Sequence, residues 1–285
     1  MNFLTMIYLT DSVYLHCSKS DWSGGSNMRI VRYQYKDSEV KYGWLHETNI
    51  GPVEGSIFAE FQRQEAKIPL ERARLYPPIQ PGKIICVGRN YVAHAKERNA
   101  EVPEVPMIFL KPPSSIAGPG DPIILPPQSQ RVEHEAELVV VIGKKGRWIS
   151  PDEALSYVFG YTVGNDVTAR DLQNKDGHWT RAKGFDTFCP IGPWIETVID
   201  AADVMITCHV NGEMRQMGST RDMVFNIKQL LSYVSSIMTI QPGDLLFTGT
   251  PSGVGPLAPG DRVEVQIEGI GTLANPVEVE THSLS

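Results

Sequence analysis

Three alternating glutamates are the feature that most restricts how this chain can fold. The stretch 131–143, Arg-Val-Glu-His-Glu-Ala-Glu-Leu-Val-Val-Val-Ile-Gly, ends in an apolar, β-branched run that predicts a buried strand. If the strand extends toward the N-terminus from this run, Glu133, Glu135 and Glu137 share one face. Burying these side chains without a counter-charge costs on the order of several kcal/mol.

Two interpretations of the glutamates fit this pattern. In the first, they bind a hard divalent cation such as Mg²⁺ or Mn²⁺, because these cations prefer carboxylate oxygens. In the second, they are solvated side chains at the start of an edge strand, because carboxylates are seldom fully buried. Asp166 ends the strand expected at 158–166 and is the natural third carboxylate for a metal site.

Composition and charge exclude several kinds of partner. The chain has 285 residues, 41% of them hydrophobic and 21% charged, which is typical of a globular protein. A net charge of -7 and the absence of any Lys/Arg run argue against nucleic acid as a partner. No apolar run is long enough for a membrane span, and four scattered cysteines favour a reduced, cytoplasmic protein.

The chain divides at a proline cluster in residues 76–82, which fits neither a helix nor a central strand. We expect residues 1–27 to be an appendage, 28–79 a small N-terminal accessory domain with a short helix within 57–64, and 80–285 the catalytic domain. Many short strands, one hairpin turning at Asn211-Gly212, and few helices predict an α+β or mostly-β core. Without regular strand–helix alternation, a doubly wound sheet or TIM barrel is disfavoured.

A histidine and a glutamate share one face of the helix expected at 91–101, with Asn90 as its N-cap. His94 and Glu97 are three residues apart, so they are neighbours on a helix. A carboxylate that fixes the histidine tautomer and raises its basicity suits activation of water. The alternative is a solvated surface pair. The helix directly follows a buried strand and a glycine turn, and such connections often carry sites.

Two lysines and a glycine-rich loop are weaker candidates for anion binding. Lys183 would hold an anionic ligand or form a structural salt bridge, and Lys111 would contact an anion or end a strand in solvent. Residues 248–255 contain neither a P-loop nor a G-x-G-x-x-G pattern, but their amides could hold a small carboxylate.

Taken together, the motifs closely resemble the fumarylacetoacetate hydrolase family from about residue 80 to the C-terminus, and the N-terminal unit resembles the accessory domain of some bacterial relatives. This resemblance implies a mixed β-sheet rolled into a pseudo-barrel, within an α+β fold, and a homodimer. The motifs occur in the family's order: Gly88-Arg-Asn-Tyr-x-x-His94-x-x-Glu97, Glu135-Ala-Glu137, Gly164-Asn-Asp166-x-x-x-Arg-Asp-Leu-Gln173, Lys183-Gly-Phe-Asp, Val210-Asn-Gly-Glu213 and Thr248-Gly-Thr-Pro-x-Gly-Val-Gly255.

The resemblance also implies the roles of the site residues. Glu135, Glu137 and Asp166 would bind Mg²⁺ or Mn²⁺, with Glu133 outside the ligand set. The family's eukaryotic namesake has a further acidic ligand before the histidine motif, whereas residues 86–90 contain no acid, so water is expected there. Two further sets of residues would act around the metal: the water-activating dyad His94 and Glu97 on a mobile helix, and Gln173, Lys183 and Thr250 on the substrate's oxygens.

The expected reaction is metal-dependent hydrolysis of a carbon–carbon bond in an acylpyruvate, a small 2-oxo or diketo acid. The cation would stabilise an enolate, Lys183 would neutralise part of its charge, and His94 would deprotonate the attacking water. Oxaloacetate decarboxylation or tautomerisation and isomerisation of muconate-type diacids stay open, because they use the same enolate. A non-enzymatic protein with a metal staple is the remote alternative. A metal dioxygenase would require two histidine ligands, and His134 points away from the glutamate face.

Overall fold

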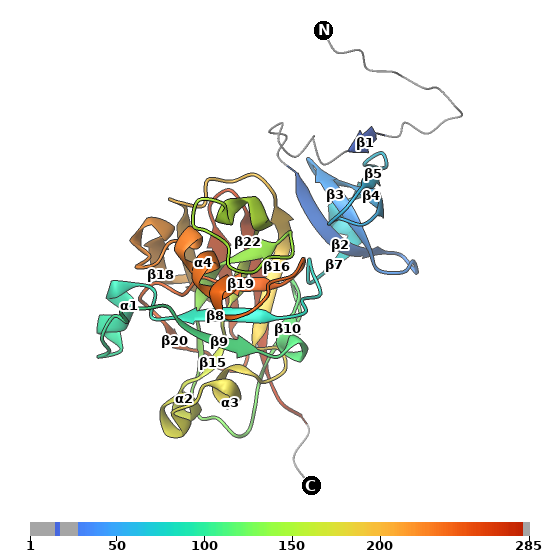
Figure 1. Cartoon of the computed structure of the whole chain (residues 1–285). Helices are drawn as coiled ribbons and strands as arrows, with labels where there is room; N and C mark the ends of the chain where they lie inside the picture. Colours follow the sequence, from blue (N-terminus) through green and yellow to red (C-terminus); the bar gives the residue numbers. More distant parts are fainter. Residues whose placement is uncertain (1–14, 18–27, 282–285) are drawn as a thin grey trace.

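The computed structural model describes residues 15–17 and 28–281 (Figure 1). Strand β1 (Leu15–Cys17) pairs with β5 (Phe61–Arg63), and the rest of the expected N-terminal appendage lies outside the described residues. None of the helices in the described ranges is both long and apolar enough to cross a membrane. Mixed sheets with few helices confirm the α+β class.

The accessory unit is built almost wholly from antiparallel strands. The helix expected within residues 57–64 is wrong, because β5 occupies 61–63 and pairs with β4. The Trp44 indole also donates to the Gln64 carbonyl at 2.8 Å, which holds this segment against β3. The remaining elements of the unit are β2 (Arg29–Tyr35), β3 (Lys41–His46), β4 (Asn49–Gly55), β6 (Ile68–Pro69), η2 (Leu70–Arg72) and β7 (Ala73–Tyr76).

One large sheet runs through both units, because β2 pairs antiparallel with β16. From β2 it continues through β16, β14, β13 and β19 to β8 and the edge strand β9, and only β19 and β8 are parallel neighbours along this path. These strands are β8 (Ile84–Gly88), β9 (Met107–Lys111), β13 (Ala136–Ile142), β14 (Val158–Asn165), β16 (Cys189–Glu196) and β19 (Leu245–Phe247), with β10 (Ile116–Ala117) pairing beside β16.

Two smaller sheets complete the main unit. The hairpin expected at Asn211-Gly212 is confirmed, since both residues have positive φ and join β17 to β18. Over the described residues every sheet is an open path of strands, so none closes into a barrel. The strands are, in sheet order, β11 (Ile123–Leu125), β22 (Gly271–Val279), β21 (Arg262–Ile267), β17 (Met205–Val210) and β18 (Glu213–Ser219), and then β15 (Thr168–Ala169), β12 (Val132–His134) and β20 (Gly255–Pro256).

The helices are short and lie around the sheets (Figure 1). Among the helices of the described residues, only α4 reaches three turns, and a capping box between Asn226 and Gln229 satisfies its first turn. The helices are α1 (Val92–Glu97), α2 (Arg170–Asp176), α3 (Thr180–Lys183) and α4 (Ile227–Ile237), with single turns η3 (Pro113–Ser115), η4 (Ala154–Tyr157) and η5 (Thr220–Asp222).

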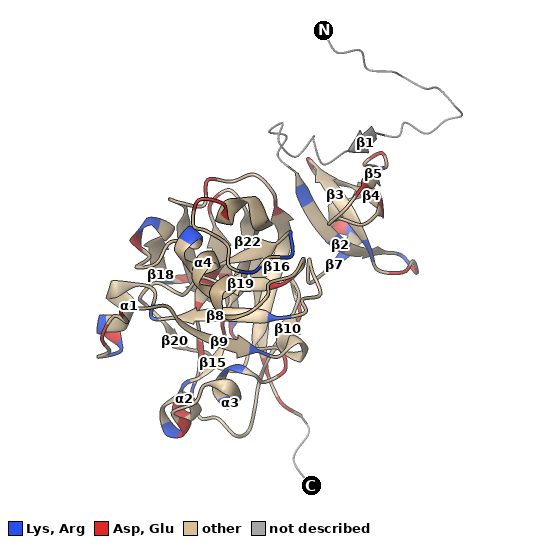
Figure 2. Ribbon diagram, in the orientation of Figure 1, with Lys and Arg blue, Asp and Glu red and all other residues tan. Residues whose placement is uncertain are grey.

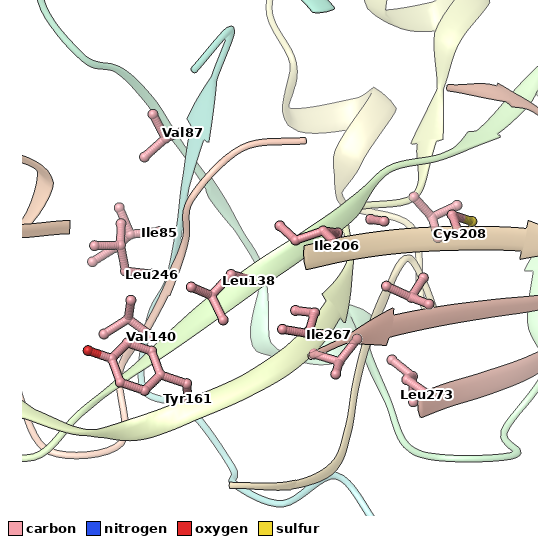
Figure 3. Close-up of a cluster of buried hydrophobic side chains, with 14 of the residues drawn as sticks. Ile85, Val87, Leu138, Val140, Tyr161, Ile206, Cys208, Leu246, Ile267 and Leu273 are labelled. Atoms are coloured by element: carbon pink, nitrogen blue, oxygen red, sulfur yellow. The ribbon is translucent and has the colours of Figure 1, made fainter. Parts of the chain in front are cut away.

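Strand β13 is buried on both faces, which explains its continuous apolar sequence. Leu138 and Val140 pack into the core toward Ile206, on the five-stranded sheet (Figure 3). Val139 and Val141 face the opposite way, into a core that also contains residues of β2, β8 and β16. The strand is therefore held from both sides, and its N-terminal end is a rigid support.

Asn90 does not cap α1, contrary to the sequence prediction. The helix starts one residue later, with Tyr91 as its N-cap. The fully buried Asn90 amide instead donates to the carbonyls of Phe225 and Thr248 at 3.0 and 2.8 Å, and its oxygen accepts from the Phe225 amide at 2.8 Å. It thereby ties the turn after β8 to two segments that are distant in sequence.

Replacing Asn90 with alanine should lower the free energy of unfolding by about 2–4 kcal/mol, because the buried Thr248 carbonyl and two partly buried backbone groups of Phe225 lose their partner. Urea unfolding monitored by tryptophan fluorescence measures this loss. The control Glu101→Ala removes an exposed side chain and should change stability by less than about 0.5 kcal/mol. Equal stability of the two variants would show that water replaces the Asn90 amide.

Candidate functional site

Three carboxylates meet at the N-terminal end of β13. Antiparallel pairing places Glu137 opposite Gly164 of β14, and the Asp166 amide donates to the Glu135 carbonyl at 2.8 Å. Each side chain offers one oxygen, and the three oxygens lie within 4.8 Å of one another. All three residues are at most 5% exposed, so the solvated-edge interpretation is wrong.

Buried cations surround two of these carboxylates. Lys183 donates to Glu135 at 2.7 Å and to Asp166 at 2.5 Å. Lys111 donates to the other Asp166 oxygen at 2.5 Å, and Arg170 hydrogen-bonds Glu135. Glu137 accepts a hydrogen bond from the Gly249 amide at 2.7 Å. Within residues 28–281, no Lys, Arg or His forms an ion pair with Glu137.

The surroundings shift the pKa values of Glu135 and Glu137 in opposite directions. Burial raises the pKa of Glu137 well above its usual range, and the charges of Asp166 and Glu135 raise it further. Burial also opposes ionisation of Glu135, but Lys183 and Arg170 outweigh it and lower its pKa. Glu137 therefore lacks a counter-charge, and carboxylate oxygens of Glu135 and Asp166 lie close to it. A hard divalent cation bound by Glu135, Glu137 and Asp166 would supply that charge, so this donor set fits Mg²⁺ or Mn²⁺.

Lys111 and Lys183 differ in how many of their N–H groups already donate to acceptors in the protein. An ammonium carries three donors. Lys111 uses them on Asp166 and on the carbonyls of Val167 and Phe188, at 3.2 and 2.6 Å. Lys183 has two acceptors among the described residues, and its third N–H is available to a ligand. Lys111 is therefore placed to fix Asp166, and Lys183 to contact a bound oxygen.

The short helix α1 brings His94 to the cavity that the three carboxylates line. His94 Nδ1 lies 3.3 Å from Glu97 Oε2, and the Gly253 amide donates to both Glu97 oxygens at 3.0 and 3.2 Å. Burial lowers the pKa of His94, although Glu135 and Glu97 oppose the shift. A neutral ring that donates from Nδ1 to Glu97 presents a lone pair on Nε2, which can accept a proton.

Gln173 and Thr250 also line this cavity. The Gln173 oxygen accepts from Arg170, so its amide nitrogen remains a donor. The Thr250 hydroxyl donates to the Ala136 carbonyl at 2.9 Å and accepts from Gln216 at 2.7 Å. Its hydroxyl hydrogen is therefore already used within the protein.

Sequence reasoning missed the role of Arg170 and left that of Lys111 undecided. Arg170 joins Glu133, at 2.7 Å, to Glu135, and the only sequence signal was its place in the motif ending at Gln173. Glu133 is also bound by Arg131 at 2.6 Å and lies outside the three-carboxylate cluster. The buried position of Lys111 depends on the loop after β14, which its own neighbourhood in the sequence does not indicate.

These groups line one cavity of about 510 Å³, which is large enough for a small-molecule ligand. Phe109 and Trp179 form an aromatic wall with ring centroids 5.1 Å apart, and Lys183 lies 5.0 Å from the Phe109 ring centroid. The polar lining consists of Arg89, His94, Glu97, Arg98, Asn99, Glu135, Glu137, Asp166, Arg170, Gln173, Asn174, Lys183 and Thr250.

Two family models match the chain on either side of the proline cluster. The model described as fumarylacetoacetate (FAA) hydrolase C-terminal matches residues 83–278, and the model described as Rv2993c-like, N-terminal matches residues 28–78. The chain therefore belongs to the fumarylacetoacetate hydrolase family, as its motifs predict. It is an enzyme of that family, whose members act on small-molecule acids.

Its relatives include proteins with isomerase and tautomerase names. A protein of Methanocaldococcus jannaschii is 58% identical over 71% of this chain and 85% of its own length. The mitochondrial oxaloacetate tautomerase Fahd2a of Rattus norvegicus is 47% identical over 93% of this chain and 96% of its own. The crystal structure of 2-hydroxyhepta-2,4-diene-1,7-dioate isomerase from Mycobacterium marinum aligns with a TM-score of 0.83 and 41% identity, covering 90% of this chain and all of that one.

Replacing Glu137 with glutamine should weaken Mn²⁺ binding at least about tenfold, because the amide keeps the shape but removes the uncompensated charge. Titration calorimetry with Mn²⁺ measures the affinity. In the control His94→Ala, which leaves the three carboxylates intact, Mn²⁺ affinity should stay within about threefold of the unsubstituted protein. Unchanged affinity in Glu137→Gln would remove this residue from the ligand set.

Proposed function

We propose that this enzyme catalyses keto–enol tautomerisation of a small 2-oxo acid of the oxaloacetate class, with Mg²⁺ or Mn²⁺ bound by Glu135, Glu137 and Asp166. The observation that carries the proposal is a buried histidine in the same cavity as a buried carboxylate cluster and a lysine with one N–H to spare. The similarity to an oxaloacetate tautomerase along nearly the whole of both chains supports this substrate class.

The proposed mechanism uses the residues according to their contacts. A divalent cation in the carboxylate site would polarise the keto group as a Lewis acid. His94 Nε2 removes a proton from the carbon beside the keto group, and Glu97 keeps the ring in the required orientation. The spare N–H of Lys183 stabilises the negative charge that develops on the enolate oxygen. Return of the proton from His94 to that oxygen gives the enol and restores the neutral histidine.

Hydrolysis of an acylpyruvate is the second candidate, and the His94–Glu97 contact is the observation that favours it. The same histidine would remove a proton from water, and the resulting hydroxide would attack the carbonyl beyond the enolisable carbon. Cleavage of the carbon–carbon bond would release pyruvate in its enolate form and a carboxylic acid. Gln173 would hold a substrate oxygen through its free amide nitrogen in either reaction.

We also propose that the enzyme works as a homodimer in the cytoplasm. The family resemblance supports the dimer. Three described cysteines, Cys86, Cys189 and Cys208, are buried free thiols, which favours a reducing compartment. Light scattering of the purified full chain measures the oligomeric state.

With Mg²⁺ or Mn²⁺ present, the full chain should accelerate decay of the oxaloacetate enol, and EDTA should abolish the effect. His94→Ala should lower the rate about 10²–10⁴-fold, the usual contribution of a positioned general base. Following the enol absorbance at several enzyme concentrations measures this rate. The exposed neighbour Lys96 supplies a control, Lys96→Ala, which should retain full activity.

Acetylpyruvate and fumarylpyruvate assayed in parallel separate the two candidates. Turnover of oxaloacetate enol without release of pyruvate from either diketo acid supports the tautomerase. Stoichiometric pyruvate from a diketo acid, with no effect on oxaloacetate, would replace it with the hydrolase. Normal rates in His94→Ala on every substrate would refute the role of the histidine in both.

A further inference from the structure

Two arginines in the wall of the cavity have positive charge that no nearby carboxylate neutralises well. Arg89 lies in the turn after β8, and Arg98 is the C-cap of α1. Neither arginine is among the residues proposed to bind the metal, to stabilise the enolate oxygen or to transfer the proton. Both arginines are therefore available to contact a part of the substrate away from its reacting atoms.

Arg98 faces a carboxylate, Glu133, that two other arginines already bind. Its guanidinium lies 3.6 Å from Glu133 Oε2, which is too long for a hydrogen bond. Arg131 and Arg170 bind the two Glu133 oxygens at 2.6 and 2.7 Å. Burial and then the positive charge of Arg170 lower the pKa of Arg98, although Glu133 and Glu135 oppose the shift. An additional anion would be favourable at this point.

Arg89 forms no ion pair with any carboxylate in the described part of the chain. Its backbone has a φ of 57°, the left-handed region that glycine adopts without strain and other residues rarely do. A glycine would make this turn more easily, yet an arginine occupies it. Strained non-glycine residues concentrate at ligand sites, where the side chain compensates for the cost.

Arg98 is connected to the carboxylate cluster by a chain of ion pairs. Arg98 faces Glu133, Glu133 binds Arg170, and Arg170 in turn binds Glu135. A ligand that extends from the carboxylate cluster toward Arg98 therefore passes from the end that binds a cation to an end with excess positive charge. Arginine suits a carboxylate at that end, because its planar fork matches the two oxygens.

We propose that Arg89 and Arg98 form a subsite for the distal carboxylate of a 2-oxo dicarboxylic acid, and thus select diacids over monoacids. The inference rests on the proposed function for the orientation of the substrate, whose 2-oxo end lies at the carboxylate cluster. Glu97 ends α1 and Arg98 is its C-cap, so one turn carries both the dyad glutamate and the subsite arginine. Figure 2 shows charged residues of both signs on α1.

Two acids of equal chain length isolate the distal carboxylate. Calorimetry of the full chain with Mg²⁺ should show that 2-oxoglutarate binds about ten- to hundredfold more tightly than 2-oxopentanoate, which ends in a methyl group. Arg98→Met and Arg89→Met should each remove most of this preference by weakening 2-oxoglutarate alone. Arg98→Lys should retain part of it, because the charge remains without the fork.

Lys96→Met is the matched control, since it removes one positive charge from the same turn outside the cavity lining. It should leave the ratio of the two affinities unchanged, and an equal loss there would attribute the preference to general charge and overturn the subsite. Equal binding of both acids by the unsubstituted protein, or no binding of 2-oxoglutarate, would also overturn it. Because binding is measured without turnover, a failed tautomerase assay leaves this result separately interpretable.

Discussion

The structure depends on the balance of charge at the N-terminal end of β13. Glu133, Glu135, Glu137 and Asp166 are all buried there, and each must be ion-paired, bind a cation or hold a proton. Lys111, Lys183 and Arg170 are buried with them and neutralise all but Glu137. Replacing such clusters with apolar residues is often neutral or stabilising, so stability alone does not account for this one. A binding site that requires negative charge at a fixed place would account for the cluster.

The surrounding fold holds this charge in place. Residues of β13 point alternately into two cores, so neither face of the strand can shift without disturbing packed side chains. The loops after β14 and β19 then bring Asp166 and the Gly249 amide to the same end. The carboxylates are thus positioned by a rigid sheet, whereas His94, the proposed proton-transfer group, lies on a six-residue helix. Rigid elements suit the metal site, and a helical connection suits a group that must meet the substrate.

How much could be predicted from the sequence depends on how local each signal is. Alternation indicated the proximity of Glu135 and Glu137, and Asn211-Gly212 indicated a hairpin, because both patterns arise within a few residues. The single strand expected to carry all three glutamates is wrong, because β13 begins at Ala136 and Glu133 lies on β12 of another sheet. Asn90 looked like an N-cap because caps are also local, but its amide pairs with residues about 135 and 158 positions away. The role of Arg170 was missed, and that of Lys111 was left undecided, for the same reason. Their carboxylate partners are set by the pairing of strands, which a single sequence specifies only through resemblance.

The helix that carries His94 is too short to be stable alone, because isolated helices need roughly 12–15 residues. Its order comes from the burial of His94 and Ala95 and from the bonds between Glu97 and the Gly253 amide. Glu97 therefore has two functions, since the carboxylate that orients the imidazole also anchors the helix. An anion bound at Arg98 would add a further contact at the end of that helix and restrict it further. Substrate recognition and placement of the base are physically the same event in such an arrangement, because both depend on one turn of α1.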